Sequence, residues 1–314
     1  MTKIRREPDG KAAASILQNV LHSTRFRSLV TLILIALLGS RLDSGKIFRT
    51  LDGFDGTTGL LMLAVNIVLI LVFAKRWQVI AAGLKLELPY GQLVRAIWLA
   101  TFLGQFGPTL LIAEATRFQM IRKHATTSQL IVSQILDRIS GQIVLFMIVL
   151  LLFPMYVDHL QTSFSKLLFG LSGMILAVAL IFRFLYPGIR SLLQTGAREA
   201  IELLGWRGLA GHYSLSLIVQ LLLILNFSLA AAGIGVLDRL LPFLVTVPLV
   251  FATITLLPIT ISDWGSRESA AVILLSPSGL GAETIVSVSV LYGLFHLLAA
   301  VPGGLFLVYN PLGK

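Results

Sequence analysis

Two stretches of the sequence place an arginine close to carboxylates. Glu114 and Arg117 stand three positions apart, so on a helix they share one face and can form an ion pair. Asp263 and Arg267 stand four positions apart, while the adjacent Glu268 would point about 100° away from Arg267. The planar guanidinium fork of arginine matches the oxygens of a phosphate. Each stretch therefore either holds an anionic headgroup or neutralises its own charges and fixes the local fold.

A third charged pair, Asp137 and Arg138, stands at the start of an uncharged run over 139–157. Arg138 either faces the protein interior or extends its long side chain to the membrane surface. Asp137 is either a proton carrier or a charge at a helix end. The candidate headgroup-binding residues are thus Glu114, Arg117, Asp137, Arg138, Asp263, Arg267 and Glu268. Further polar or helix-breaking residues in apolar surroundings are expected to line a path, namely Gln105, Pro108, Pro258, Gly265, Tyr292 and His296.

The sequence contains no recognisable catalytic or cofactor motif. It has no cysteine, which excludes disulfides, zinc–thiolate sites and thiol catalysis. None of its five histidines stands at metal-ligand spacing from another, and Walker A, GxSxG and GxGxxG sequences do not occur. We therefore expect no metal, no cofactor and no enzymatic activity. One alternative stays open, an intramembrane enzyme that uses Glu114 or Asp137 as acid and base.

The composition is that of a membrane protein. Of 314 residues, 56% are hydrophobic and only 13% are charged, against about 25% charged in average globular domains. So few charges cannot cover the surface of a soluble fold of this length. The net charge of +10 fits lysine and arginine gathered in cytoplasmic loops better than a nucleic-acid-binding surface.

The uncharged stretches predict a single all-α membrane domain over residues 1–314. A helix needs about 20 apolar residues to cross the hydrocarbon core. Six full spans are expected, around 25–42, 56–74, 126–153, 165–184, 211–237 and 283–309. Residues 1–24 are expected to form a basic cytoplasmic segment rather than a cleaved signal peptide. Two amphipathic segments, 41–55 and 188–206, are expected to be helices on the membrane surface.

Residues 96–123 and 241–278 do not fit ordinary spans, because proline and glycine break an apolar run in each. Such breaks are tolerated in a membrane only inside protein or against a water-filled cavity. Both segments are therefore predicted to be re-entrant helical hairpins. That topology places most lysines and arginines in the cytoplasm with both termini, and the two hairpins then enter from opposite sides, as in an inverted repeat.

The sequence resembles a known family at these two hairpins. Residues 108–117 (PTLLIAEATR) resemble its first motif, residues 136–138 (LDR) its next acidic–arginine pair, and residues 257–268 (LPITISDWGSRE) its second motif. Leu291-Tyr292 and residues 302–304 (PGG) resemble its last helix. The family is the flippase-like membrane domain of lysylphosphatidylglycerol synthases and their stand-alone relatives. This chain departs from it at residues 111–113, which carry no glycine, and at Asp263, which replaces one.

The resemblance implies movement or binding of an amphipathic lipid. We expect a bacterial-type inner-membrane flippase for a phospholipid-like or polyprenyl-linked lipid. The alternative is a lipid-binding subunit that scaffolds a membrane-associated glycosyltransferase or lipid-modifying enzyme. The chain ends soon after its last expected span, so neither the soluble aminoacyl-transfer domain nor synthase activity is expected. Membrane lipids are the expected partners, and nucleic acid is not.

Overall fold

The computed structural model of the chain describes Leu32 and residues 43–107, 109–157, 187–236, 240–256 and 260–309. Within these ranges every regular element is a helix. The basic segment 1–24, the predicted spans 25–42 (apart from Leu32) and 165–184, and both Pro108 and Pro258 lie outside the described residues.

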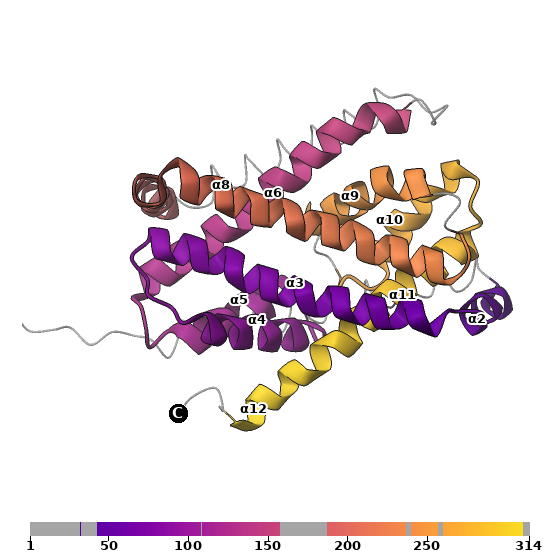
Figure 1. Cartoon of the computed structure of the whole chain (residues 1–314), viewed down its shortest axis with the longest axis horizontal. Coiled ribbons are helices and arrows are strands. Elements are labelled where there is room, and N and C mark those ends of the chain that lie inside the picture. The colour runs from indigo at the N-terminus through magenta and orange to yellow at the C-terminus, as the bar shows by residue number, and fades with distance from the viewer. Residues whose placement is uncertain are drawn as a thin grey trace, which may run out of the picture.

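The described helices follow one another in the order shown in Figure 1. They are α2 (Ser44–Asp52), α3 (Gly56–Gly83), α4 (Tyr90–Gly104), α5 (Thr109–Ile121), α6 (Thr127–Val157), α8 (Pro187–Gly233), α9 (Leu240–Leu256), α10 (Ser266–Leu275), η2 (Ser276–Ser278), α11 (Ala282–Ala300), η3 (Val301–Gly304) and α12 (Leu305–Tyr309). Helices α3 and α8 run side by side along the long axis of the molecule (Figure 1). Helix α4 lies against α3, α5 lies against α4 and α6, α9 lies against α6 and α8, and α10 lies against α9 and α11.

Four helical segments of the described chain are long and apolar enough to cross a membrane, with mean hydropathies between 2.0 and 2.4. They cover 56–83, 127–152, 200–233 and 282–307, and they coincide with four of the six predicted spans. Large apolar side chains on them face outward, for example Leu150 and Leu151 on α6. Such outward-facing side chains are suited to hydrocarbon rather than to water.

Local sequence explains where these helices begin and bend. Asp55 precedes α3, and its carboxylate accepts hydrogen bonds from the backbone N–H groups of Thr57 and Thr58, which are otherwise unpaired in a first turn. Gly205 interrupts α8 with φ of 57°, a conformation that a side chain disfavours. The predicted amphipathic helix over 188–206 therefore corresponds to the first part of α8, and this first part ends at the bend at Gly205. The one predicted over 41–55 is α2.

Both predicted hairpins are broken where proline and glycine indicated. Helix α4 ends at Gly104 and packs against α5, which begins at Thr109; α9 ends at Leu256 and packs against α10, which begins at Ser266. Helix α4 has 15 residues and α10 has 10, which correspond to about 22 Å and about 15 Å of rise. Neither arm is long enough to cross about 30 Å of hydrocarbon.

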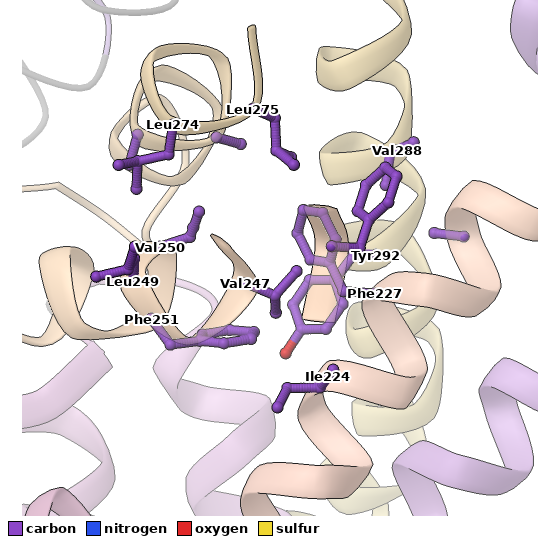
Figure 2. Packing of buried hydrophobic residues seen from close by; sticks show 14 of the residues in the cluster. Ile224, Phe227, Val247, Leu249, Val250, Phe251, Leu274, Leu275, Val288 and Tyr292 are labelled. Atoms are coloured by element: carbon purple, nitrogen blue, oxygen red, sulfur yellow. The ribbon is translucent and has the colours of Figure 1, made fainter. Parts of the chain in front are cut away.

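Aromatic side chains form the centre of the core between α8, α9 and α11 (Figure 2). The ring of Tyr292 lies 5.4 Å from that of Phe227 and 5.6 Å from that of Phe251, centroid to centroid. A second buried cluster surrounds Trp77, which is fully enclosed by residues of α3, α4 and α6.

Candidate functional site

A chain of linked ionic side chains joins α3, α5 and α6. Asp137 is buried, and its two carboxylate oxygens accept from Arg76 Nε at 2.9 Å and Arg76 Nη2 at 3.1 Å. Arg117 Nη2 also donates to Asp137, at 3.1 Å. Arg117 Nη1 reaches Glu114 at 3.1 Å, and Glu114 accepts in turn from Arg138 Nη1 at 3.1 Å. We call these five residues the Asp137 ion chain; it confirms the predicted Glu114–Arg117 pair.

Small and aromatic neighbours hold this ion chain in place. The guanidinium of Arg117 lies 4.1 Å from the ring centroid of Trp77, and the indole N–H of Trp77 donates to Ser133 at 3.2 Å. Gly141 leaves room for Arg76, because a Cβ there would lie 2.6 Å from Arg76 Nη1. The arginines are therefore fixed by packing as well as by charge.

The second hairpin has its own charged group, which we call the Arg267 cluster. Arg267 Nη2 donates to Glu268 Oε1 at 2.8 Å, and Arg267 Nε donates to the hydroxyl of Ser289 on α11 at 3.0 Å. Ser289 donates to the same carboxylate oxygen, and the other oxygen of Glu268 accepts from the backbone N–H of Gly265 at 2.6 Å. Arg267 also lies over the ring of Trp264, at 5.0 Å.

This cluster corrects one prediction. Spacing along a regular helix paired Arg267 with Asp263, but the ion partner of Arg267 is Glu268. The reason is that the helix begins only at Ser266, after Gly265 at φ 83°. Glu268 turns back to cap this helix start, which brings its carboxylate to the guanidinium. Asp263 contributes its backbone carbonyl, which accepts from the N–H of Arg267 at 3.0 Å.

The breaks of the two hairpins touch each other. The hydroxyl of Ser262 donates to the amide oxygen of Gln105 at 2.7 Å, and the backbone N–H of Ser262 lies 3.4 Å from the carbonyl oxygen of Gly107. Ser262 and Asp263 both have positive φ, 49° and 60°, which is uncommon outside glycine. The second loop is thus bent sharply against the first.

A cavity of about 220 Å³ lies beside this contact; we call it the central cavity. Its charged and polar lining comes from both hairpins and from α6 and α11, and includes Gln105, Arg138, Ser262, Asp263, Arg267 and His296. Tyr292 lines it as well. Of the predicted residues, Glu114, Arg117, Asp137, Glu268 and Gly265 do not line it but support those that do. Pro108 and Pro258 lie outside the described chain.

His296 is oriented by a partner on α3. The amide nitrogen of Asn66 donates to the carbonyl oxygen of Met62, which leaves its amide oxygen 3.0 Å from His296 Nδ1. Nδ1 is therefore the donor, and Nε2 of the neutral ring remains an acceptor. The ring is parallel to that of Tyr292, four residues earlier. A histidine fixed in this way presents one defined nitrogen to its surroundings.

A second cavity of about 170 Å³, the side cavity, lies between α3, α6, α8 and α9. It shares Arg138, Leu223, Phe251 and Thr255 with the central cavity. Gln142 also lines it, and the amide oxygen of Gln142 is buried without a hydrogen-bond partner among the described residues. Arg138 thus stands between two adjoining spaces.

Sequence reasoning missed three partners of the charged residues. Arg76 follows the predicted span 56–74, and a charged residue at that position is what the end of any membrane span would show. Asn66 and Ser289 are single polar residues in apolar runs. A buried carboxylate needs a counter-charge, so Asp137 was itself a signal that an arginine such as Arg76 had to reach it. Nothing in the spacing identified which one.

The comparisons with known proteins agree with the architecture. The family model described as the lysylphosphatidylglycerol synthase TM region matches residues 25–304. That match covers both hairpins and all four candidate spans apart from residues 305–307 of the last one. Comparison with curated proteins and with solved structures gives no match. The chain is therefore an integral membrane protein that belongs to the lysylphosphatidylglycerol synthase TM-region family.

Proposed function

We propose that the protein is a lipid flippase that moves a phospholipid-like or polyprenyl-linked lipid across a bacterial-type inner membrane. Membership of the family indicates a function related to membrane lipids. The observation that carries the proposal is the central cavity, where the breaks of two helical hairpins meet and where Arg138 of α6 lies together with Asp263 and Arg267 of the second hairpin.

The chemistry of this cavity suits a phosphate-bearing headgroup. Arg138 uses Nη1 for Glu114, and Arg267 uses Nε and Nη2 for its cluster, so each retains donors that make no hydrogen bond within the described protein. Both arginines line the cavity. Guanidinium donors form strong, directional bonds to phosphate oxygens. Glu114 and Glu268 pair with these arginines and balance part of the positive charge.

The size of the cavity supports a headgroup site rather than a site for a whole lipid. Pockets for drug-sized ligands usually measure about 300–1,000 Å³, whereas this one measures about 220 Å³. The acyl chains therefore stay in the bilayer while the headgroup occupies the cavity. A headgroup alone in hydrocarbon would lose several kcal/mol for each unpaired polar group, and the cavity offers those groups partners.

Two hairpins entering from opposite leaflets would shorten the apolar barrier from both sides. One arm of each hairpin, α4 and α10, is too short to cross alone, which supports the re-entrant topology, and we propose that both termini lie in the cytoplasm. We propose no enzymatic activity and no cofactor. The sequence carries no nucleotide-binding motif, so an ion gradient, lipid synthesis on one leaflet, or a partner supplies any driving force. A lipid-modifying enzyme or glycosyltransferase is the partner class we propose.

The test is a leaflet-accessibility assay in liposomes, using the lipid that co-purifies with the protein. We expect the purified protein to accelerate transfer between leaflets, and Arg267→Ala and Arg138→Ala to slow it. Arg95→Ala is the matched control, because Arg95 is exposed on α4 and does not line the cavity. Lipid that co-purifies but crosses no faster than in empty liposomes, with an ion gradient imposed, would favour the scaffolding role instead.

A further inference from the structure

His212 is a buried titratable residue that the proposed headgroup site does not use. It lies on α8, only 1% exposed, in a helix that packs against α3 and α6. Its Nδ1 is 3.3 Å from the carbonyl oxygen of Arg76, and its Nε2 is 2.5 Å from the hydroxyl oxygen of Ser140. That hydroxyl is in turn 2.9 Å from the carbonyl oxygen of Asp137. The imidazole is thus linked to the backbone of both residues that form the Arg76–Asp137 ion pair.

The three contacts that run from Arg76 through His212 and Ser140 to Asp137 need three hydrogens. The carbonyl oxygens at the two ends can only accept. The hydroxyl of Ser140 supplies one hydrogen and a neutral imidazole supplies one more, so one contact would be left without a hydrogen. An imidazolium donates from both ring nitrogens and completes all three contacts. The hydrogen-bond geometry therefore suits the protonated ring better than the neutral one.

The charges around His212 set the condition under which it gains a proton. Asp137 on α6 favours the imidazolium and Arg76 on α3 opposes it, while the ring of Tyr213, next to His212 on α8, stands edge-on to the imidazole. The Asp137 ion chain has three arginines and two carboxylates, so it already carries one surplus positive charge. An imidazolium would raise the surplus to two, which is costly in an apolar surrounding. A bound anion would remove that cost.

We propose that His212 is a proton-binding site, and that the protein takes up a proton there when a phosphate headgroup binds to Arg138. The headgroup brings a negative charge to the end of the ion chain, and the imidazolium then restores a surplus of one. Both carboxylates of the chain accept from two arginines each, so the imidazole is the group that gains the proton. The inference rests on the proposed headgroup site and names the proton as its coupled ion.

Proton and headgroup should strengthen each other's binding. Coupling free energy is reciprocal, so a headgroup that favours the imidazolium of His212 binds more tightly when His212 is protonated. One linked proton allows the affinity for the headgroup to fall by at most about tenfold per pH unit as the pH rises. Release of the headgroup returns the proton. A pH difference across the membrane is then the gradient that drives lipid transfer.

The experiment measures proton uptake by calorimetry of the full chain in detergent. The probe is a short-chain phosphatidylmethanol, because its phosphodiester carries one negative charge and does not titrate near neutral pH. The heat of binding is measured in two buffers that differ in ionisation enthalpy, and the difference between the two heats gives the protons taken up. We expect the wild type to take up a fraction of a proton per lipid and to bind more weakly as the pH rises.

His212→Gln should lose this proton uptake, and its affinity for the probe should not change with pH. Glutamine keeps one donor group and one acceptor group but cannot titrate in this range. Ser140→Ala is a second variant, which keeps the imidazole but removes the acceptor of its second hydrogen, and it should take up fewer protons than the wild type. His124→Gln is the matched control, since His124 is exposed between α5 and α6, and it should keep the wild-type uptake.

The nitrogen-15 NMR spectrum of histidine-labelled protein reads the charge of His212 directly. The ring signals that are missing in His212→Gln should move from the neutral to the imidazolium position when the probe is added. If His212→Gln does not fold, Ser140→Ala and this spectrum of the wild type decide.

The outcomes separate this inference from the proposed function. Binding of the probe without proton uptake by the wild type, or uptake that persists in His212→Gln, overturns the proton site and leaves the flippase proposal standing. Failure of the probe to bind refutes the headgroup site, and the inference falls with it. A protein that binds the probe with proton uptake but does not transfer lipid in liposomes refutes the flippase proposal and keeps the proton site.

Discussion

The hydroxyl of Ser262 donates to the amide oxygen of Gln105 at 2.7 Å, which joins two residues that are 157 positions apart in the sequence. Each lies at the break of its own hairpin, so this bond holds the two breaks against each other beside the central cavity. The charged groups on either side, the Asp137 ion chain and the Arg267 cluster, make no ion pair with each other among the described residues.

Removing this bond should loosen the contact between the hairpins. We expect Ser262→Ala and Gln105→Leu each to lower the free energy of unfolding by about 1 kcal/mol, and the double variant to lose less than the sum because the two share one bond. Thermal unfolding in detergent measures the three values. Ser276→Ala is the control, since the Ser276 hydroxyl follows α10 and donates to the carbonyl oxygen of Val272 in that helix. Fully additive losses would contradict a direct interaction.

Asp137 should be the most sensitive carboxylate for stability. Asp137→Asn leaves Arg76 without an ion partner in a buried position, and breaking such a pair from one side costs about 3–5 kcal/mol. Adding Arg76→Gln should restore part of the loss, because the unpaired charge is then gone. Unfolding in denaturant compares the single and double variants. A double variant no more stable than Asp137→Asn would show that Arg76 is not the group left uncompensated.

Gly293 should be required for the position of Arg267. A Cβ at Gly293 would collide with the Arg267 guanidinium and lie 3.0 Å from Trp264. We expect Gly293→Ala to displace the guanidinium and reduce lipid transfer at least tenfold, the effect of losing one charge-assisted bond. Gly91→Ala is a matched control on α4, where an added Cβ meets nothing within 4 Å. Equal transfer by the two variants would contradict a role for the packed guanidinium.

Asp55 should make the stability of the folded protein depend on pH in the acidic range. Hydrogen bonds from the Thr58 side chain and backbone hold the pKa of this exposed cap below its ordinary value of 3.8. Because the pKa of Asp55 is lowered in the folded state, its ionised carboxylate stabilises the fold fully at pH values above its ordinary pKa. This stabilisation is lost as the pH falls through the pKa of the folded state. Asp55→Asn keeps an N-terminal cap but cannot titrate. Its unfolding temperature should therefore fall less than that of the wild type on acidification below pH 3.8.

Single cysteines can test the hairpin topology, because the natural sequence has none. Glu87 precedes α4 and His124 follows α5, and both are exposed. If the first hairpin is re-entrant, Glu87→Cys and His124→Cys should label from the same side of the membrane. Asp52→Cys, beyond the other end of α3, should label from the opposite side. Labelling of Glu87→Cys and His124→Cys from opposite sides would mean that α4 and α5 in sequence span the membrane once, which contradicts a re-entrant hairpin.

The sequence predicted the helices well because apolar length and helix breakers are local properties. The apolar run after Gly56 predicts a membrane-spanning helix from its length alone. The proline and glycine residues near Gly104 and Gly265 predict helix ends within a few positions. The pairing of charges was less predictable. Regular helix spacing predicts an ion pair between Arg267 and Asp263. Because the helix begins only at Ser266, the partner of Arg267 is Glu268 instead.

The partners from distant segments could not be predicted from spacing at all. Arg76 and Asp137 are 61 positions apart, and Asn66 and His296 are 230 apart. Their meeting depends on how α3 packs against α6 and α11, and many packings satisfy the same apolar pattern. A buried charged residue predicts that an ion partner exists, but only the packed structure identifies that partner.

The position of Arg138 between the central and side cavities has a kinetic consequence. A headgroup that moves from one space to the other encounters the same guanidinium, and one guanidinium serves one phosphate at a time. The rate of transfer should therefore saturate as the lipid concentration rises. Different phosphate-bearing amphiphiles should slow one another as competitive inhibitors, with an inhibition constant that follows their affinity for this single residue.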